Sequence, residues 1–322
     1  NLKFWRNKMK KQLLIAAVAA TMGTAAMADI SITGNAEYKY THTDNNTTNA
    51  TTNAATTEVN VKIKGSHGDT TVYLDNEFTS SEVDGAGMDT ENMYLKTKVG
   101  PLSVTAGNWA GSTSANTGEI LDNARSSNKI SVSAPAGPLK VGFWTTPGTG
   151  TSDGFTISGS VAGVNIGLKE ASNQYTDINV SGEIAGVSYR LDNYDAEAAT
   201  DDAFYGMVSK EFNGVTLTVN HIEAKKGATL TEDDGVFDAF DVDDVTYKIT
   251  RVAAGMDIAG NAVTVAMQNS TEDNGADNDS VKVTAVRTLA AGMVVKGTFQ
   301  SADNVTATGD TDTATLELDV SF

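Results

Sequence analysis

The sequence predicts an all-β fold, a transmembrane antiparallel up-and-down β-barrel of 16 or 18 strands. Three observations predict it: an export signal at the N-terminus, alternation of apolar and polar residues along the rest of the chain, and connections that are alternately short and long. Alternation with a period of two indicates strands with one apolar and one polar face. Short turns at one end and long loops at the other are typical of barrels that cross a membrane.

The first 28 residues have the features of a leader that is removed after export. Within it, Met9–Ala28 resembles a signal peptide, with two lysines, a short apolar stretch and a cleavage site of small residues at Ala26-Met27-Ala28. The apolar stretch is too short to favour a transmembrane helix. We therefore expect a mature chain that starts at Asp29 and forms a single barrel domain over 29–322.

The composition excludes several classes of protein. There is no cysteine, so disulfides, thiol catalysis and cysteine-bound metals are excluded, and the three histidines (His42, His67 and His221) are scattered. The 41 acidic residues outnumber the 23 basic ones, which argues against a nucleic-acid partner. No catalytic or nucleotide-binding motif is present. We expect no enzyme activity, no metal site and no cofactor.

Both ends of the mature chain alternate strictly. Apolar or small residues occupy every second position from Ile30 to Tyr40 and again from Ala314 to Phe322, with polar residues between them. Similar stretches recur throughout, and a plain count of them gives 18 strands. Two weak strands near 139–170 could merge, which leaves 16 or 18 strands.

The connections fall into two groups. Short turns are predicted at 67–69, 100–101, 135–138, 162–163, 185–186, 213–214 and 290–292. Long polar loops are predicted at 44–56, 79–90, 109–127, 195–202, 224–243, 269–279 and 301–311. The first of these loops is rich in Asn and Thr and is predicted to be mobile. Several of the others are acidic, so weak binding of divalent cations at the outer loops is a further expectation.

The charged residues support a barrel in which the apolar face meets lipid and the polar face lines the lumen. Twelve of the 18 basic residues after the leader fall on the polar face: Lys39, Lys62, Lys64, Lys96, Lys98, Lys129, Lys140, Lys169, Arg190, Lys248, Lys282 and Lys296. A charge on the lipid face would cost several kcal/mol near the bilayer centre. A soluble β-sandwich predicts the same pattern, and the leader, the strand number and the loop asymmetry favour the barrel.

Four stretches carry a resemblance to a known family. They are Asp29 to Asn35, Gly100 to Asn108, Leu121 to Pro135, and the C-terminal Leu318 to Phe322. In this order they resemble segments of the general diffusion porins of Gram-negative bacteria. Two departures are that the family usually has 16 strands and that it commonly has Arg where this chain has Asn108.

The resemblance implies a homotrimer in the cell outer membrane, with water-filled channels for passive diffusion of small hydrophilic solutes and ions. Segment 109–127 would be a constriction loop whose acids, Glu119 and Asp122, face a basic pore wall. The wall candidates are Lys39, Lys62, Lys64, Lys96, Lys98, Arg125 and Lys129. Phe322 would end a barrel-insertion signal read by the barrel-assembly machinery, and the outer surface would contact membrane lipid and lipopolysaccharide.

The acidic excess predicts a weak preference for cations. An exported β-rich surface or adhesion protein without a channel remains the alternative function.

Overall fold

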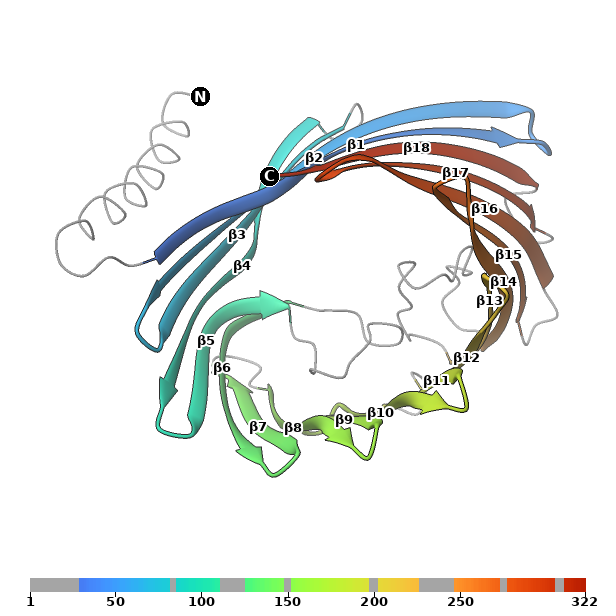
Figure 1. Cartoon of the computed structure of the whole chain (residues 1–322). Coiled ribbons are helices and arrows are strands. Elements are labelled where there is room, and N and C mark those ends of the chain that lie inside the picture. Colours follow the sequence, from blue (N-terminus) through green and yellow to red (C-terminus); the bar gives the residue numbers. More distant parts are fainter. Residues whose placement is uncertain are drawn as a thin grey trace, which may run out of the picture.

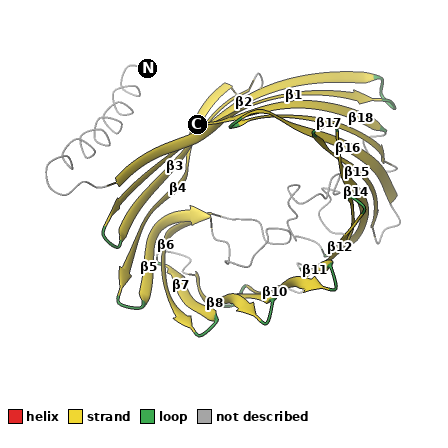
Figure 2. Cartoon of the chain, in the orientation of Figure 1, coloured by secondary structure: helices red, strands yellow, loops and turns green. Residues whose placement is uncertain are grey.

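A computed structural model describes residues 29–81, 85–110, 125–147, 152–196, 202–225, 246–272, 277–304 and 310–322. These residues form strands and the turns between them (Figure 2), and none of them belongs to a helix long and apolar enough to span a membrane. The strands are β1 (Asp29–Asn45), β2 (Ala50–His67), β3 (Thr70–Ser81), β4 (Gly85–Val99), β5 (Leu102–Ala110), β6 (Arg125–Ala136), β7 (Leu139–Thr146), β8 (Ser152–Val161), β9 (Val164–Ala171), β10 (Tyr175–Ile184), β11 (Val187–Ala196), β12 (Ala203–Phe212), β13 (Val215–Ala224), β14 (Tyr247–Ile258), β15 (Asn261–Glu272), β16 (Asp277–Ala290), β17 (Met293–Asn304) and β18 (Thr311–Ser321). The predicted leader lies outside the described residues.

The strands form one closed antiparallel sheet of 18 strands (Figure 1). Each strand pairs with its neighbours in the chain, and β1 pairs with both β2 and β18, which closes the ring. The count of 18 from the alternation is therefore confirmed, and the 16 strands usual in the resembled family are not what forms. The weak strands near 139–170 stay separate as β7, β8 and β9.

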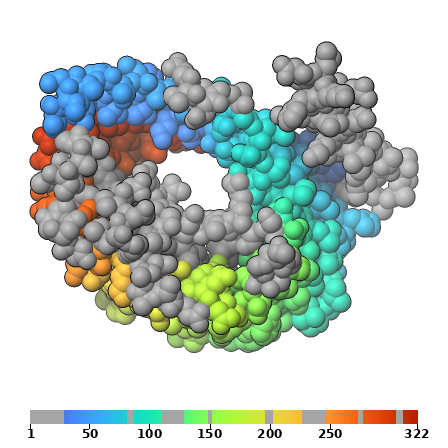
Figure 3. All heavy atoms as spheres, turned by 180° about the vertical axis from the view of Figure 1, so that it is seen from behind, coloured from blue at the N-terminus to red at the C-terminus, as the bar shows by residue number. Residues whose placement is uncertain are grey.

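The two faces of the sheet differ as the alternation predicts. Large apolar side chains are exposed on the outer face, for example Ile32, Phe143 and Ile184, at 63%, 66% and 67% of their full area. Polar and charged side chains such as Asn179 and Asp192 point the other way and are buried. An opening remains through the ring of strands in the space-filling view (Figure 3). A barrel of this many strands encloses a lumen wider than its side chains can fill.

All seven predicted short turns join consecutive strands, and they define what we call the turn end of the barrel. Several are two-residue turns with positive φ at both positions, as at Ala185-Gly186 (53° and 72°) and Asn213-Gly214 (52° and 82°). This geometry matches the twist of antiparallel hairpins. One more turn of this kind, Ala259-Gly260, was not predicted. The opposite end of the barrel is called the loop end.

The prediction of a loop over 44–56 is wrong. β1 continues to Asn45 and β2 begins at Ala50, so most of this Asn/Thr-rich segment forms a regular hairpin. The side-chain carbonyl of Asn45 accepts the backbone N–H groups of Thr47 and Thr48 at 3.1 and 2.8 Å, which fixes the turn. The predicted loop over 79–90 is likewise mostly strand, because β3 ends at Ser81 and β4 begins at Gly85.

The last residue closes the barrel. Phe322 and Gly34 exchange two backbone hydrogen bonds of 2.9 Å, which extends the pairing of β18 with β1 to the end of the chain. The phenyl ring lies over Gly34, where a side chain would collide with it. Gly34 therefore provides the space that the terminal ring occupies on the outer face.

Candidate functional site in the lumen wall

The lumen face carries the basic residues predicted for the pore wall. Directly opposite residues in antiparallel strands point to the same face, and the register joins Lys39 to Glu317, Lys62 to Asp75 and Lys96 to Thr105. The six predicted lysines on this face are Lys39, Lys62, Lys64, Lys96, Lys98 and Lys129.

The predicted constriction loop is tested only at its edges. Trp109 continues β5, and Arg125 begins β6, so the ends of the predicted 109–127 loop are strand. The remaining residues of that loop, which include Glu119 and Asp122, lie outside the described ranges, and so does the side chain of Arg125.

The wall lysines have two kinds of surroundings. On the β17–β1 side, the ammonium of Lys296 lies 3.2 Å from a carboxylate oxygen of Glu317, which also faces Lys39. The other side is different. Among the described residues, no carboxylate forms an ion pair with four lysines on β4, β6 and β7: Lys96, Lys98, Lys129 and Lys140. These four lysines of the β4–β7 wall therefore have no direct carboxylate partner within the described part of the barrel.

A recess of about 160 Å³ opens in this wall, and we call it the lysine recess. Four lysines, two tryptophans and six hydroxyl side chains line it: Lys96, Lys129, Lys140, Lys169, Trp109, Trp144, Ser103, Thr105, Ser131, Ser133, Thr156 and Ser158. Ammonium groups and hydroxyls are the donors that a carboxylate or phosphate accepts from. The recess therefore has the chemistry of an anion site rather than a cation site.

Aromatic rings hold the two buried ammonium groups of the recess. The Lys129 ammonium lies 5.3 Å from the ring centre of Trp109 and 4.7 Å from that of Trp144. The Lys169 ammonium lies 5.5 Å from the ring centre of Tyr175. A ring attracts a cation through its quadrupole but carries no net charge. The ring contacts orient Lys129 without neutralising it, whereas Lys169 also lies opposite Asp177.

A bulge interrupts the pairing of β5 with β6 next to Trp109 and Lys129. Gly107 faces Lys129 and Trp109 faces Ser126, so Asn108 alone lies opposite two residues of β6. One of those two is Asn128, which has a φ of 55° and donates its backbone N–H to the side-chain oxygen of Asn108 at 2.7 Å. Asn108, the departure from the resembled family, therefore stabilises the bulge that lies beside the recess.

An acidic pair lies next to the lysine recess. The carboxyl groups of Asp177 and Asp192 are hydrogen-bonded to each other across β10 and β11, and both side chains are almost fully buried. Asp177 is also the register partner of Lys169. Within the described ranges, no group of three or more histidine or carboxylate side chains is placed to hold a metal ion.

Sequence reasoning missed part of the site and misplaced one residue. Trp109 was assigned to a loop, and Lys140 and Lys169 were placed on the polar face without a role at the constriction. Lys248 was also placed on the polar face of its strand, and this prediction is wrong. Its side chain is on the outer face, where the ammonium nitrogen lies 3.3 Å from a carboxylate oxygen of Glu223. The sequence signal for Lys140 and Lys169 was their position in the alternation of polar and apolar residues, which placed both correctly on the lumen face.

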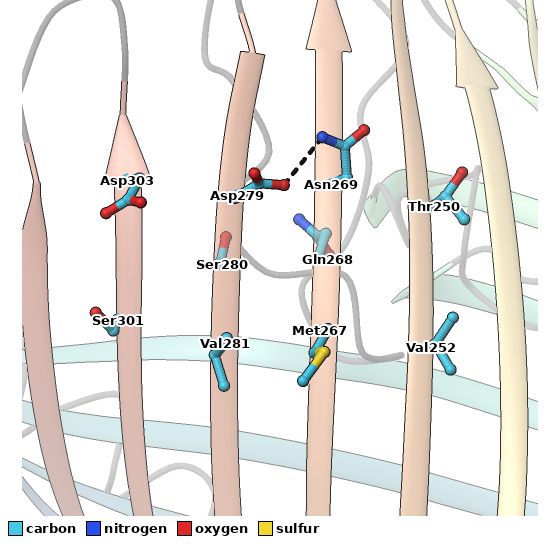
Figure 4. A pocket seen from close by; sticks show the side chains of 10 residues that line it. All are labelled: Thr250, Val252, Met267, Gln268, Asn269, Asp279, Ser280, Val281, Ser301 and Asp303. Atoms are coloured by element: carbon cyan, nitrogen blue, oxygen red, sulfur yellow. Dashed lines mark hydrogen bonds between the residues drawn. The ribbon is translucent and has the colours of Figure 1, made fainter.

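A second hollow lies at the loop end of β14–β17 (Figure 4). Exposed apolar side chains, including Met267 and Val281, give way along the strands to Asn269, Asp279 and Asp303. The amide of Asn269 donates to Asp279 at 3.0 Å. This change from apolar to polar marks the edge of the apolar belt on the outer face.

No model of a protein family matches the sequence, and no curated protein matches it. Solved structures do match. The crystal structure of OccAB3 from Acinetobacter baumannii has a TM-score of 0.67 and 10% identity, covering 92% of this chain and 100% of that one. OccK2 from Pseudomonas aeruginosa, in complex with glucuronate, has a TM-score of 0.69 and 12% identity, covering 91% and 98%. The outer membrane protein OpdK of the same species has a TM-score of 0.66 and 10% identity, covering 91% and 99%.

At such low identity these matches show the fold. The chain has the fold of outer-membrane β-barrel porins with 18 strands, which confirms the closed antiparallel barrel expected from the sequence. The closed sheet and its apolar outer face agree with an outer-membrane location.

Proposed function

We propose that this chain is an outer-membrane porin, a water-filled channel for passive diffusion of small hydrophilic solutes and ions. The observation that carries the proposal is a closed 18-strand barrel with an apolar outer face and charged, polar side chains along its lumen. Such a barrel is wide enough to leave an aqueous path. The polar and charged side chains along the lumen favour contact with water and dissolved solutes.

The test is single-channel conductance of the purified protein in a planar bilayer. Stepwise insertions with ohmic current are expected. Protein that shows heat-modifiable mobility on a denaturing gel, and is therefore a folded barrel, but that gives no current would refute the proposal. That result would favour the alternative, an exported surface or adhesion protein.

A weak preference for cations is part of the proposal. The chain has 41 acidic against 23 basic residues, and carboxylates such as Asp44, Asp279 and Asp303 lie on the outer face near the loop end, around the mouth of the barrel. Negative charge at a channel mouth raises the local cation concentration within about 8–10 Å at moderate salt. The expected reversal potential in a KCl gradient has the cation sign, and an anion sign would refute this preference.

The lysine recess adds a local site within the same channel, and we propose that it retains anionic solutes. Its four lysines support this, and glucuronate in the OccK2 complex makes a sugar acid a suitable first probe. Sugar-acid salts are expected to increase current noise or to block the open channel briefly, whereas neutral sugars of the same size are not. Equal effects of both would exclude a role for the charge.

Homotrimer assembly, insertion by the barrel-assembly machinery through the C-terminal segment, and contact with lipopolysaccharide belong to the same proposal. Conductance steps in groups of three and a cross-linked trimer in detergent are the expected results for the oligomer. Single steps and a monomer would refute the trimer without affecting the channel. Divalent cations at the acidic outer loops would appear as a calcium-dependent rise in thermal stability.

A further inference from the structure

Strand β2 extends beyond its neighbour β3 at the loop end. Its register with β3 ends at the pair Thr56 and Ser81, whereas its register with β1 continues to the pair Ala50 and Asn45. The six residues from Ala50 to Ala55 therefore pair with β1 on one side, and no described strand pairs with their other side, which we call the free edge. The three residues that join β3 to β4 must close that hairpin, so they are too few to pair along it. The free edge is about 20 Å long at about 3.3 Å per residue.

The free edge lies at the polar end of the outer face. The outward side chains of β1 are apolar or small from Ile30 to Tyr40, and they are polar at His42 and Asp44. The free edge lies beside residues 40–45 of β1, and five of its six residues are exposed. Unpaired backbone groups would cost several kcal/mol in lipid. In water they are hydrated instead, and they are available to a partner strand.

Side chains hold this part of β2 against β1. The Tyr40 hydroxyl donates to the side-chain oxygen of Asn53 at 2.8 Å, and the Thr51 hydroxyl donates to a carboxylate oxygen of Asp44 at 2.6 Å. β1 is itself paired with β18 to the same level. The free edge therefore belongs to a three-stranded sheet that is already formed. A partner strand can pair with it without the entropic cost of ordering it first.

The free edge lacks the features that usually prevent two sheet edges from pairing, which are charged side chains, proline and bulges. From Asn45 to Thr57 the sequence consists of Asn, Thr and Ala alone, and the register of β1 with β2 is continuous. Two copies of this edge therefore meet without repulsion between their own side chains. Thr and Asn side chains also form hydrogen bonds across strands, as Thr43 and Thr313 do between β1 and β18.

We infer that the free edge of β2 is a contact surface for a second copy of this chain, and that two such edges join as an antiparallel pair between barrels in facing membranes. The inference goes beyond the proposed channel and does not depend on it. β2 runs from the loop end to the turn end in every copy, so two barrels in one membrane present their free edges in the same direction. Antiparallel pairing, which is the more stable per residue, requires one barrel to be inverted. A barrel in a facing membrane is inverted in this way.

Clustering of vesicles measures such contacts, because many weak pairs between two membranes add up. The full chain is reconstituted into phosphatidylcholine vesicles that carry a donor or an acceptor dye, and energy transfer is followed at physiological ionic strength. Vesicles with the protein are expected to cluster, and empty vesicles are not. Thr52→Lys/Ala54→Lys places like charges opposite each other in the paired edges and should weaken pairing roughly 2- to 30-fold. The matched control is Thr311→Lys/Thr313→Lys, which adds the same charge on β18, a strand paired on both sides, and should cluster as the unchanged protein does.

Single cysteines test the direction of the pairing, because the chain has no cysteine of its own. An antiparallel pair with two-fold symmetry places one residue, at the centre of the edge, opposite its own copy. Either Thr52→Cys or Asn53→Cys should therefore give a disulfide-linked dimer under mild oxidation, whereas Ala50→Cys and Ala55→Cys should not, because a disulfide needs Cα atoms within about 7 Å. A parallel pair in register would link all six positions. Heat-modifiable mobility of each variant shows that it is folded.

Folded protein that does not cluster vesicles would overturn the inference and leave the free edge to an extended segment of a different protein. Clustering that survives Thr52→Lys/Ala54→Lys, disulfides at all six positions, or disulfides at none would also overturn it. The proposed channel fails separately. Folded protein without current would refute the pore, whereas vesicle clustering and the cysteine variants would still decide whether two copies pair through β2.

Discussion

Two glycines on neighbouring strands allow the closing seam of the barrel to be tested by a matched pair of substitutions. Gly34 on β1 lies beneath the ring of Phe322, and an added methyl group would collide with that ring and with the backbone carbonyl of Asn60. Gly65 on β2 is the register partner of Ile30 on the same outer face, and nothing lies within 4 Å of its added methyl group. Both changes remove the backbone freedom of a glycine within a strand.

The matched pair isolates the cost of the collision. Alanine in place of a strand glycine stabilises by about 0.5–1 kcal/mol through the backbone, and this contribution is common to both variants. Overpacking typically costs about 1–3 kcal/mol, and only Gly34→Ala incurs it. The unfolding free energy of Gly34→Ala should therefore lie about 1–3 kcal/mol below that of Gly65→Ala. Urea unfolding in detergent, followed by tryptophan fluorescence, measures both values.

A double-mutant cycle adds the role of the terminal ring. Phe322→Leu should reduce the cost of Gly34→Ala, because the smaller side chain relieves part of the collision, although the contact with the Asn60 carbonyl remains. Equal unfolding free energies for the two alanine variants would refute the closed seam described here. A cost of Gly34→Ala that is unchanged by Phe322→Leu would show that the ring does not cover Gly34.

Three further outcomes are expected at the lysine recess. Lys129→Met should shorten the residence time of anionic solutes in the recess at least about fourfold, which current noise measures. This factor corresponds to the attraction between two opposite unit charges about 5 Å apart in bulk water. Lys62→Met, on β2 outside the recess, should change it less. Asn108→Ala removes the acceptor of the bulge and should lower the unfolding free energy by about 0.5–1.5 kcal/mol, with a red shift of tryptophan emission if the recess opens to water. Gly107→Ala should cost about 1–3 kcal/mol in urea unfolding, because the methyl group collides with Tyr94, and should alter the unit conductance.

Most of the fold could be predicted from the sequence because lipid imposes a simple rule. Within the apolar belt every second residue must be apolar, so the outer face of strands such as β7 and β10 is visible as alternation: Phe143 and Ile178 are exposed there. The strand count and the short turns follow from the same pattern. The register and the bulges do not, since they depend on contacts between strands.

Beyond the apolar belt this rule no longer holds, and the wrong predictions for Lys248 and for the loop over 44–56 lie there. Near the loop end of β14, the outer face meets water, so Lys248 can pair with Glu223 on the outside. Its neighbour Ile249 turns inward and packs against Ile222 and Ala224 in a small apolar cluster. The β1–β2 hairpin also extends past the belt, where Thr51 donates to Asp44 at 2.6 Å, and polar side chains stabilise strands that alternation cannot reveal.

The candidate site was only partly predictable for a different reason. The alternation along each strand placed Lys96, Lys129 and Lys169 on the lumen face, but it does not give the distances between side chains of different strands. The recess lies beside the bulge at Asn108, and a bulge adds one residue to one strand without a sequence signature of its own. Trp109 was consequently assigned to a loop although it belongs to β5.

The partners of the wall lysines explain how two sides of the same lumen can differ in net charge. Glu317 neutralises Lys296 at 3.2 Å, so the β17–β18 wall gains little net charge from this pair. Lys129 is held instead by two indole rings, which fix its position as a carboxylate would but leave its charge intact. Replacing Trp144 by Glu would keep a partner for Lys129 and cancel the charge. If the recess acts through its field, that variant should lose anion retention while remaining folded, and unchanged retention would show that the field of Lys129 does not act on solutes.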